Sequence, residues 1–509
     1  MLVDKNDKVI GTKEKMKCHE GEGVLHRAFS VYIFNPKGEL LIQQRSKQKH
    51  LWPLHWSNSC CSHPRKGETY VDSSERRLEE ELGFTCALRS VDQFQYRAKY
   101  KDVGSENEIL TVLVGVYDGE VDPDPGEINK WKWISLEKLK DDIKKNPDLY
   151  TPWFKKGLER YLKIKEKRDK EKENLKKLLK EIVGKTDPVI EKLLKTHIEE
   201  RFYNLITHQV STGGKRLRPA LTLISAKMMG GKEKDTIYPA AGTEILHNST
   251  LITDDIIDHS EIRRGKPTVW KKYGQSIAEC MGLDYTATVY LAANNSPDPE
   301  KIVKIYTKTF KQIVEGEIYD VLFEQRGRDE EPYISQNRYR KVPLESYFQM
   351  VGKKTATLLE SCCEIGGICA GAGGKDLKNL KDYGYNLGIA FQIQDDILDI
   401  FGNEKKFGKK IGKDIEERKL GNIVIFYALQ SLSQVQRKKI LKILQKKNIL
   451  DKDIKEAINL IKQTSARRKA FHLGEKYAGE AKKSLEKLPQ NKWNKYLNTL
   501  ADFTIERKK

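Results

Sequence analysis

Hydrophobic and polar positions follow two different periods along this chain of 509 residues. In roughly the first 150 residues, apolar positions alternate with polar ones or form short runs bounded by turn residues, which is the pattern of strands. Strands are predicted at "AFSVYIF" (28–34), "LLIQQ" (40–44) and "ILTVLVGVY" (109–117), with a hairpin turn at "NPKGE" (35–39) and a helix at "SSERRLEEELGF" (73–84). This half is therefore expected to be α/β or α+β, with a mixed sheet.

From about residue 172 onward, apolar residues recur every three or four positions, as in "LKKLLKEIVGK" and "YNLGIAFQIQDDILDIFG". This period predicts an all-α second half. Between the halves lies "KIKEKRDKEKEN" (163–174), in which Ile164 is the only apolar residue. Such a stretch cannot bury a face, so it is a solvated helix or a flexible tether. We expect domains at 1–162 and 175–509, joined by a charged linker at 163–174.

Charge and composition narrow the class of protein. The net charge of +20 fits nucleic acid, an anionic membrane surface or diphosphate substrates as partners. Eight cysteines without a regular framework suit a reducing cytosol. "MLVDKNDKVIG" has no apolar core, and no apolar run approaches the length of a membrane span. We therefore expect a soluble, cytoplasmic protein without a transmembrane segment.

Histidines, a cysteine and glutamates gather in the first half. "CHEGEGVLH" contains His19 and His26, "NSCCSHP" contains Cys61 and His63, and "SENEI" contains Glu106 and Glu108. On a strand the two glutamates point the same way. Three imidazoles and two carboxylates can then converge on one divalent ion, and this ligand set admits Zn²⁺, Mn²⁺ or Mg²⁺.

This half resembles type I isopentenyl diphosphate isomerase, a Nudix-fold enzyme. The resemblance runs through "TKEKMKCH", "LHRAFS", "LWPLHWSNSCCSHP", "ERRLEEELGF", "YRA", "ENE" and "TPW". The Nudix box is partial, with matching residues at Glu68, Arg76, Glu80, Glu81 and Gly83. Arg77 stands where the hydrolase pattern has glutamate, which argues against a diphosphate hydrolase.

The resemblance implies a role for each site residue. Glu108 delivers a proton to the alkene, and Cys61 removes one as a thiolate whose pKa nearby metals and cations would lower. Trp153 stabilises the cation through its ring face and Tyr96 supports the acid. Cys60 is the alternative base. The metal ligands are His19, His26, His63, Glu106 and Glu108, with a second Mg²⁺ held by Glu81. Diphosphate contacts are implied for Lys15, Arg45, Lys49 and Arg77.

Two aspartate clusters mark the second half. "LITDDIIDHSEIRRG" (251–265) carries Asp254, Asp255 and Asp258, and "FQIQDDILDIFG" carries Asp395, Asp396 and Asp399. Read as a helix, Asp254 and Asp258 share a face. Mg²⁺ would relieve their repulsion, and arginines would grip a phosphate bidentately. Basic residues also recur in "GGKRLRP" (213–219), "KKTATLL" (353–359) and "GKKIGKDIEERK" (408–419). Together these segments predict two diphosphate subsites around Mg²⁺.

These motifs resemble the trans head-to-tail polyprenyl diphosphate synthases in order and spacing. "DDILD" argues against a terpene cyclase, whose second metal motif is of an Asn/Ser/Glu type. The resemblance implies isopentenyl diphosphate contacts from Gly214, Lys215, Arg218, His247 and Arg264. It implies allylic diphosphate contacts from Arg263, Lys354, Thr355, Gln392, Lys409 and Lys419. One departure is "GEIYD" (316–320), where Glu317 stands at a usual glutamine. A homo-oligomer through the synthase domain is also implied.

Product length depends on the residues one turn before the first aspartate cluster. In short-chain synthases, bulky aromatics stand four or five positions before the first aspartate, but here Thr250 and Ser249 occupy those positions. Small side chains leave the tunnel open, so geranylgeranyl diphosphate (C20) is the expected product. Farnesyl and longer products are the alternatives.

The two halves would use one substrate. The first isomerises isopentenyl diphosphate to dimethylallyl diphosphate, and the second condenses this starter with further isopentenyl diphosphate. Two other interpretations compete with this one. In one, the first half is an inactive domain or a hydrolase. In the other, the chain is a nucleic-acid or membrane-binding protein with dead catalytic remnants, but its metal and acid/base motifs are intact, so we expect no nucleic-acid partner.

Overall fold

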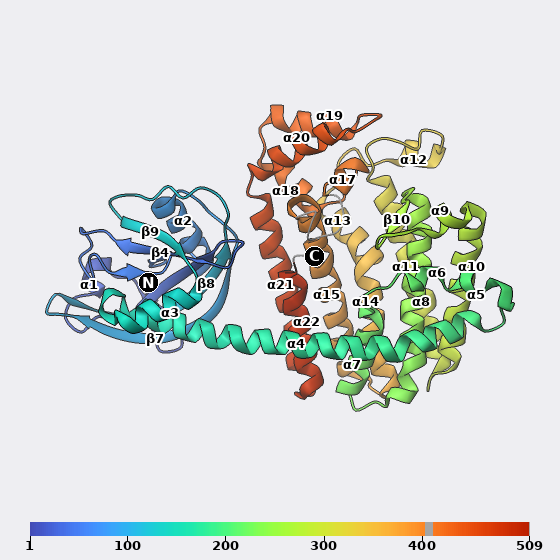
Figure 1. The fold of residues 1–509 in the computed structure, drawn as a ribbon, viewed down its shortest axis with the longest axis horizontal. Helices are drawn as coiled ribbons and strands as arrows, with labels where there is room; N and C mark the ends of the chain where they lie inside the picture. Colours follow the sequence, from blue (N-terminus) through green and yellow to red (C-terminus); the bar gives the residue numbers. More distant parts are fainter. Residues whose placement is uncertain (403–410, 508–509) are drawn as a thin grey trace. The chain divides into compact units, whose positions relative to one another are not determined.

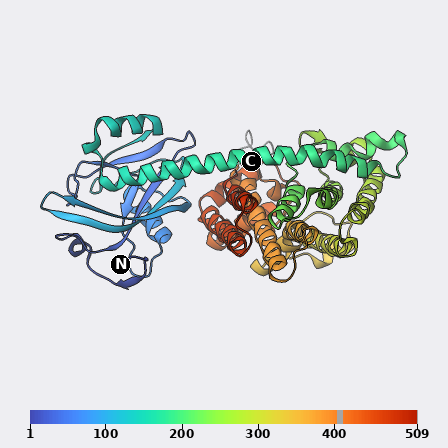
Figure 2. The ribbon, with the colours of Figure 1, turned by 90° about the horizontal axis from the view of Figure 1, so that it is seen from below.

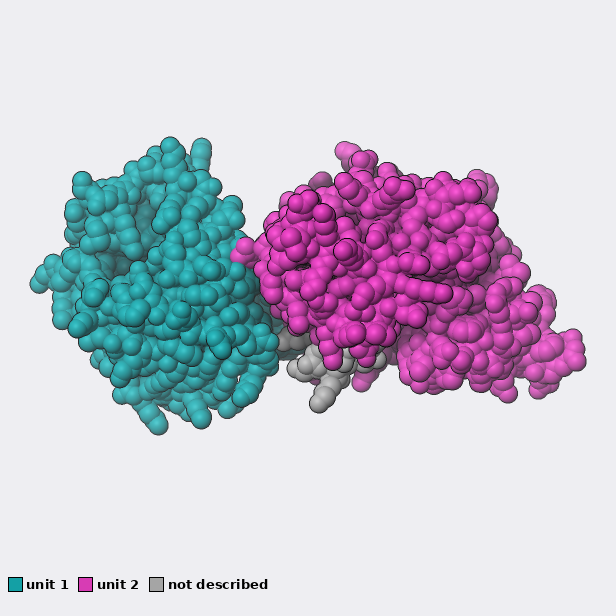
Figure 3. Space-filling view, turned by 90° about the horizontal axis from the view of Figure 1, so that it is seen from above, with its two compact units in different colours: residues 1–170 teal, residues 171–509 magenta. Residues whose placement is uncertain are grey.

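The computed structural model describes residues 1–402 and 411–507, and the chain divides into two compact units (Figure 1, Figure 3). Unit 1 comprises Met1–Lys170 and unit 2 comprises Glu171–Lys509. The division falls inside the charged segment 163–174. That segment lies within one helix, α4 (Pro152–Lys195), so it is helical rather than an irregular tether. None of the described helices has the length and apolar character that crossing a membrane requires.

Unit 1 is built on a nine-stranded mixed sheet. Its strands are β1 (Leu2–Val3), β2 (Val9–Gly11), β3 (His26–Phe34), β4 (Leu40–Arg45), β5 (Trp56–Ser57), β6 (Cys60–Ser62), β7 (Leu88–Tyr100), β8 (Gly104–Val116) and β9 (Ile128–Ile134). Strand β3 pairs in parallel with β8 along its whole length and antiparallel with β6. The predicted hairpin is present, since Phe34 of β3 pairs with Leu40 of β4.

The helices of unit 1 are α1 (Lys15–Cys18), α2 (Tyr70–Leu82), α3 (Leu136–Lys145) and the start of α4, with a 3₁₀ turn at Pro147–Leu149. The predicted helix at 73–84 corresponds to α2. This helix begins three residues earlier because Thr69 and Asp72 form a capping box. It ends where Gly83 adopts a left-handed conformation, with φ of 71°. The mixed sheet with helices expected from the sequence is confirmed.

Unit 2 is helical, as predicted, and Figure 2 views many of its helices close to end-on. The long helices are α7 (Leu217–Met228), α8 (Glu233–Ile257), α10 (Gln275–Asn294), α11 (Pro299–Leu322), α13 (Leu344–Val351), α14 (Thr357–Cys369), α15 (Gly374–Phe401), α18 (Ile423–Ser431), α19 (Gln434–Leu444), α20 (Asp451–Lys462), α21 (Ala466–Glu486) and α22 (Lys492–Glu506). Short helices are α5 (Tyr203–Ile206), α6 (His208–Ser211), α9 (Val269–Tyr273), α12 (Pro332–Asn337) and α17 (Lys413–Glu416), with a 3₁₀ turn at Glu200–Phe202. A two-stranded ribbon joins β10 (Ile262–Arg263) to β11 (Lys266–Pro267).

Helix α15 lies at the centre of unit 2 because apolar side chains surround it. Leu387, Ala390, Ile393 and Ile400 are all buried, and α15 packs against α14, α21 and α22. The spacing of these residues is the helical period seen in the sequence. The second aspartate cluster lies in the last two turns of this helix, so a fixed core element positions it.

A π-helical turn at Gly352–Ala356 separates α13 from α14. Two glycines permit its position. A Cβ on Gly316 of α11 would lie 2.3 Å from the backbone nitrogen of Lys354, and one on Gly388 of α15 would lie 2.5 Å from Cα of Ala356. The turn therefore fits between α11 and α15 only because both positions lack a side chain. It presents Lys354 and Thr355 from a rigid element, and π turns of this kind occur often at functional sites.

Two candidate active sites

Three histidines and two glutamates converge in unit 1, as the sequence predicts. His19 directly follows α1, His26 begins β3 and His63 follows β6. One ligand atom from each of these histidines and from Glu106 lies within 4.8 Å of the others. His19 Nδ1 is 3.0 Å from Glu106 Oε2, and His63 Nε2 is 2.9 Å from Glu108 Oε1. The alternation of side chains along β8 places both glutamates on this one face.

Cys61 and Glu108 lie on the two strands that flank β3. Cys61 pairs with Ser30 of β3, and Glu108 pairs with His26 of the same strand. Both side chains line one cavity of about 370 Å³. Cys60 points to the opposite face of β6 and is fully buried in a core cluster that includes Phe29. Of the two cysteines, the cavity is therefore accessible to Cys61.

Tyr96 and Trp153 complete the wall of this cavity. Tyr96 is the cross-strand partner of Glu108 in the β7–β8 pair. Burial raises the pKa of Tyr96 well above its usual value, and the charge of Glu108 adds to this effect, so the phenol stays protonated and can donate a hydrogen bond. Trp153 Nε1 donates to Ser57 Oγ at 3.1 Å, which fixes the orientation of the ring. The Arg45 guanidinium lies 5.2 Å from the centre of that ring.

The predicted diphosphate contacts, Lys15, Arg45, Lys49 and Arg77, all line the same cavity. Glu127, which the sequence did not identify, directly precedes β9 and forms ion pairs with Lys49 and Arg77. Arg77 also binds Glu80 and the buried Glu81. The four basic residues form the basic wall of the cavity, and Glu127 is the carboxylate beside β9 that contacts two of them. A second Mg²⁺ on Glu81 stays a prediction, because its carboxylate is held by Arg77.

The pKa of the Cys61 thiol reflects both its burial and the charges beside it. Burial raises it, and the neighbouring charges of Arg45 and Lys49 lower it by less, so the net direction is upward. Arg45 NH1 lies 3.8 Å from Cys61 Sγ, close enough to stabilise a thiolate once one forms. The predicted lowering, which includes the charge of a bound metal, therefore stays a prediction, because without a metal desolvation in this cavity outweighs two nearby cations.

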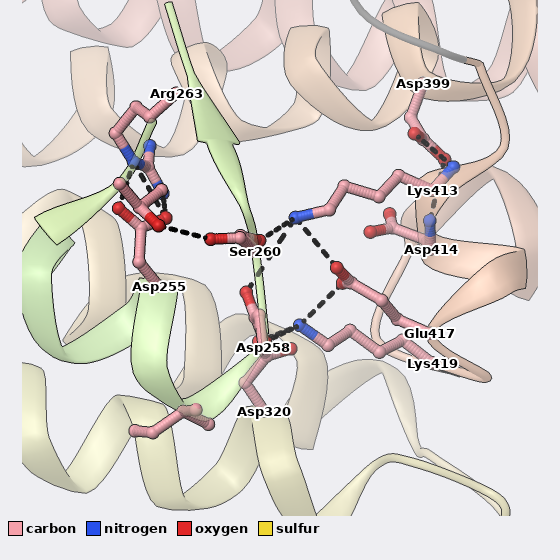
Figure 4. A network of polar contacts seen from close by, with 12 residues as sticks. Asp255, Asp258, Ser260, Arg263, Asp320, Asp399, Lys413, Asp414, Glu417 and Lys419 are labelled. Carbon is pink, nitrogen blue, oxygen red and sulfur yellow. Dashed lines mark hydrogen bonds and ion pairs between the residues drawn. The ribbon is translucent and has the colours of Figure 1, made fainter. Parts of the chain in front are cut away.

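In unit 2, the first aspartate cluster lies at the end of α8. Asp254 is in the last turn of the helix and Asp258 is its C-terminal cap, so the two residues are one turn apart as predicted. Asp255 is buried and accepts hydrogen bonds of 2.7 to 3.0 Å from the guanidinium of Arg263 (Figure 4). Asp255 thus holds Arg263, a predicted diphosphate contact, on the adjoining ribbon. Burial, followed by the charge of Glu317, raises the pKa of Asp254 to about 8.

The second aspartate cluster has three different environments. Asp395 accepts a hydrogen bond of 2.5 Å from Arg507. Asp396 is turned into the core, where it accepts hydrogen bonds from Tyr347 Oη and the Ile423 N–H, each at 2.9 Å. Asp399 accepts from the backbone N–H groups of Lys413 and Asp414 at 2.9 and 3.3 Å. Asp395 and Asp399 are one turn apart on the helix, whereas hydrogen bonds to Tyr347 and Ile423 hold the Asp396 carboxylate in the core. A metal-ligand role for Asp396 stays a prediction, and its contacts are structural.

Lysines connect the two clusters (Figure 4). The backbone of Lys413 binds Asp399, and its Nζ lies 3.9 Å from Asp258 Oδ2 and 2.7 Å from Glu417. Lys419 Nζ lies 2.9 Å from Asp320, 3.4 Å from Asp258 and 3.1 Å from Glu417. Sequence reasoning missed Lys413, Glu417 and Asp320. Their signal was present, because Asp320 ends "GEIYD" and the other two lie in "GKKIGKDIEERK".

The π-helical turn supplies the next predicted contacts. Lys354 Nζ lies 2.6 Å from both Asp320 Oδ2 and Glu317 Oε2. Thr355 Oγ1 donates to Gln392 Oε1 at 2.9 Å, and Gln392 Nε2 donates to Asp396 Oδ1 at 2.9 Å. Gln392 therefore links the turn to the second aspartate cluster. Lys409, the remaining predicted contact, lies outside the described residues.

A group of basic residues lies behind the first aspartate cluster. Gly214 has φ of 147°, and a Cβ there would lie 2.9 Å from Arg264 NH1, so the glycine lets the chain approach this guanidinium. Arg218 Nε is buried and has no hydrogen-bond partner among the described residues. Burial lowers the pKa of His247 well below its usual value, and the charge of Arg218 lowers it further. The Nε–H of Arg218 is therefore available to bind an anion, and the neutral ring of His247 can donate an N–H beside it. Lys215 is exposed beside them.

A second cavity, of about 420 Å³, begins at the first aspartate cluster. Asp254 and Thr250 of α8 line it, and its apolar lining comes from Ile257, Phe310, Ile313, Val314, Ile318, Val321, Leu322, Tyr333 and Ile334. Ser249, the other residue predicted to set the depth of the tunnel, is buried and does not line this cavity. An apolar cavity beside a carboxylate cluster can hold a hydrocarbon tail attached to a charged head group.

The donor sets of both units fit divalent cations. In unit 1, His26 Nε2 and His63 Nδ1 are buried without a hydrogen-bond partner among the described residues, and Glu106 Oε2 forms an ion pair with His19. Imidazole and carboxylate ligands together suit Zn²⁺ or Mn²⁺ as well as Mg²⁺. In unit 2 the available ligands are all carboxylate oxygens, which suit Mg²⁺ and leave positions for phosphate.

Comparisons with known proteins match the two units separately. The polyprenyl synthetase family model matches residues 199–461, and the NUDIX domain model matches residues 24–154. The geranylgeranyl diphosphate synthase of Sulfolobus acidocaldarius is 34% identical over 337 residues, 65% of this chain and 97% of that protein. The geranylfarnesyl diphosphate synthase of Aeropyrum pernix is 32% identical over 321 residues, 61% of this chain and 95% of that protein.

The isopentenyl-diphosphate Delta-isomerase of Burkholderia multivorans is 44% identical over 160 residues, 31% of this chain and 90% of that protein. Among solved structures, the geranylgeranyl pyrophosphate synthetase of Pyrococcus horikoshii has a TM-score of 0.59 and 32% identity. That match covers 66% of this chain and 99% of the other.

Proposed function

The chain belongs to the polyprenyl synthetase family and also carries an isopentenyl diphosphate isomerase of the Nudix fold, and we propose that it makes geranylgeranyl diphosphate from isopentenyl diphosphate alone. Unit 1 would supply dimethylallyl diphosphate, and unit 2 would add three isopentenyl units to it. The observation that supports this proposal most strongly is that a cysteine, a glutamate and four basic residues line one cavity in unit 1.

Isomerisation needs an acid and a base on opposite sides of the substrate. In the proposed mechanism, Glu108 gives a proton to the terminal methylene carbon and a tertiary cation forms. Cys61, as the thiolate, removes a proton from the carbon next to the phosphate-bearing carbon, and the double bond moves there. The number of protons is unchanged, and the face of the Trp153 ring stabilises the cation. Tyr96 donates its hydrogen bond to the acid, and the basic wall holds the diphosphate.

Both families depend on divalent metals, and the ion identities are proposed here. In unit 1 the metal would be held by His19, His26, His63, Glu106 and Glu108, and Mg²⁺, Mn²⁺ and Zn²⁺ are all compatible with these ligands. When bound, it would supply positive charge that increases the acidity of the Glu108 carboxyl group. A second Mg²⁺ on Glu81 would require Arg77 to release that carboxylate.

In unit 2 diphosphate leaves the allylic substrate, and the double bond of isopentenyl diphosphate forms a new bond to the allylic carbon. Loss of a proton to the released diphosphate then gives the longer allylic diphosphate. Mg²⁺ held by Asp254, Asp258, Asp395 and Asp399 would stabilise charge on the leaving group. Lys354 and Lys419 are positioned by carboxylates to meet the same group, with Arg263 and the Thr355–Gln392 pair beside it. Arg218, Arg264 and Lys215 would hold isopentenyl diphosphate near Gly214 and His247. Preorganised charge of this kind is a large part of enzymatic rate enhancement.

The product is proposed to be C20, because Thr250 leaves the cavity below Asp254 open. The identity to a geranylgeranyl diphosphate synthase and to a geranylfarnesyl diphosphate synthase is similar, so product analysis has to decide between them. We also propose that unit 2 forms a homo-oligomer. Exposed apolar side chains on α10 and α11, namely Leu283, Tyr290, Val314 and Ile318, support this proposal.

A hydrolase activity of unit 1 is disfavoured by the contacts of Arg77. This residue binds Glu80 and Glu81, which are part of the acidic set that a Nudix hydrolase uses for metals. A metal at these two carboxylates would have to displace the Arg77 guanidinium from both of them.

The test is to incubate the purified chain and Mg²⁺ with labelled isopentenyl diphosphate alone and to separate the products by chain length. A C20 product is expected. Product that forms only when dimethylallyl diphosphate is added would refute the roles given to Cys61 and Glu108. A main product of C15 or C25 would refute the proposed chain length.

A further inference from the structure

Glu317 is a buried carboxylate that the proposed mechanism does not use. It lies on α11 directly after Gly316, and its residue is 8% exposed. Neither carboxylate oxygen has a hydrogen-bond partner among the described residues. The ammonium of Lys354 approaches Oε2 to 2.6 Å as an ion pair. Burying a carboxylate with so few hydrogen bonds costs free energy of folding. A further cation bound to its oxygens would offset that cost.

The surroundings of Glu317 contain more negative than positive groups. Glu317 and Asp254 line the same cavity. Asp320 lies one turn along α11 from Glu317 and shares Lys354 with it at 2.6 Å. Lys419 lies between Asp320 and Asp258, at 2.9 and 3.4 Å. With Asp255 and Glu417 included, six carboxylates stand beside four cations among the described residues, namely Lys354, Lys413, Lys419 and Arg263, which leaves a net negative charge at the first aspartate cluster.

Resting on the function proposed for unit 2, we propose that Glu317 is an additional ligand of the divalent cation held by the first aspartate cluster. Carboxylate oxygens are the hard ligands that Mg²⁺ and Mn²⁺ prefer. A cation held by Glu317 would compete with Lys354 for this carboxylate, and Lys354 would then be available to the substrate diphosphate. Glutamine, the usual residue of the family here, offers only a neutral amide oxygen. This chain should therefore bind the first cation more tightly than a chain with glutamine would.

The experiment is a Mn²⁺ titration of the full chain, without diphosphate, followed by electron paramagnetic resonance of the free ion. Glu317→Gln should weaken binding at the first aspartate cluster by about tenfold or more, the range seen when a supporting group at a metal site is lost. The matched control is Glu315→Gln on the same helix, because Glu315 is exposed and pairs with Lys353. It should titrate like the unmodified chain. Asp254→Asn shows how the titration changes when the first aspartate cluster no longer binds Mn²⁺. Adding Glu317→Gln to that variant should not change the Mn²⁺ affinity further.

The histidine cluster of unit 1 is unchanged in every variant, so any Mn²⁺ that it takes up cancels when the titrations of two variants are subtracted. Unchanged Mn²⁺ affinity in Glu317→Gln would overturn the proposal. If Asp254→Asn also left binding unchanged, the metal role of the whole cluster and the function proposed for unit 2 would fail with it. If Glu317→Gln kept Mn²⁺ affinity but bound inorganic diphosphate more tightly in the presence of a chelator, Glu317 would only restrain Lys354. That outcome would also overturn the proposal.

Discussion

The two candidate sites of this chain solve the same problem, holding a diphosphate beside metal ligands, in different ways. In unit 1 the metal ligands are histidines and glutamates that contact one another, and the cations stand apart on the wall of the cavity. In unit 2 the carboxylates are joined to lysines and arginines in one network (Figure 4). Unit 1 therefore presents ligands ready for a metal, whereas in unit 2 a metal must compete with cations of the chain.

This difference agrees with the chemistry proposed for each unit. A proton-transfer site has to keep its metal while substrates come and go, and buried imidazoles that hydrogen bonds to the backbone hold in place, as in His19 and His26, do so. A site that releases diphosphate at each turnover gains from lysines that exchange a carboxylate for a phosphate, because charge is then compensated at every stage. Lys354 and Lys419 are the residues of unit 2 that would make this exchange.

The largest expected effect comes from removing the sulfur atom of Cys61, because this change should stop the reaction of unit 1 and leave that of unit 2 intact. Cys61→Ala should reduce isomerisation by at least ~10³-fold, within the range of acid–base catalysis. Condensation of added dimethylallyl diphosphate should stay unchanged. The measurement is product formation from isopentenyl diphosphate with and without the allylic starter. Cys60→Ala is the matched control, and a larger loss in that variant would assign the base to the wrong cysteine.

A pH profile should show the competition between protons and metal in unit 2. The pKa of Asp254 is about 8 because of burial and Glu317. A metal bound there must displace a proton below that pH, so the Mg²⁺ concentration for half-maximal condensation should rise as pH falls from 8 to 6. The limit is about tenfold per pH unit. Isomerisation should also slow as pH falls, because burial raises the pKa of the Cys61 thiol and less thiolate is present, so the two sites are compared by their Mg²⁺ requirement and not by rate. An equal Mg²⁺ requirement at pH 6 and pH 8 would contradict this assignment.

Product length tests the cavity beside Asp254. Thr250→Phe places an aromatic ring in the lining and should shift the main product from C20 to C15. Ser249→Phe enlarges a buried side chain outside the lining and should lower the melting temperature, since overpacking a core costs about 1–3 kcal/mol. Chromatography of the products and thermal unfolding check both variants. An unchanged product from a folded Thr250→Phe chain would place the end of the tunnel elsewhere.

The smallest effect concerns Glu127, the carboxylate that contacts the basic wall of the cavity in unit 1. Glu127 pairs with Lys49 and Arg77, so a diphosphate that contacts both must displace it. Glu127→Gln should lower KM for isomerisation by about two- to fivefold, because a partly exposed ion pair is worth about 1 kcal/mol or less. Glu120→Gln, an exposed residue nearby in the sequence, is the control. A raised KM would mean that Glu127 positions the cations instead of competing for them.

Local patterns predicted the fold and many of the site residues. Strand alternation placed Glu106 and Glu108 on one face, and helical spacing placed Asp254 and Asp258 one turn apart. The relative positions of side chains on a single helix or strand, or within a single motif, could therefore be predicted from the sequence.

Pairings between distant segments were not accessible. Glu127 reaches Lys49, and Asp320 reaches both Lys354 and Lys419, only once the chain has folded. The burial of the Cys61 thiol, which raises its pKa, could not be predicted from the sequence for a similar reason. Neighbouring cations can be guessed from a motif, but the depth of burial that outweighs them cannot.

The central claim is that one chain holds two separate sites connected by released dimethylallyl diphosphate. The most direct test mixes two inactive chains, Cys61→Ala and Asp254→Asn, and supplies labelled isopentenyl diphosphate alone with Mg²⁺. Each variant alone should form no C20 product, and the equimolar mixture should restore it, because the Asp254→Asn chain makes the starter that the Cys61→Ala chain uses. Product from the Cys61→Ala chain alone, or none from the mixture, would contradict this account.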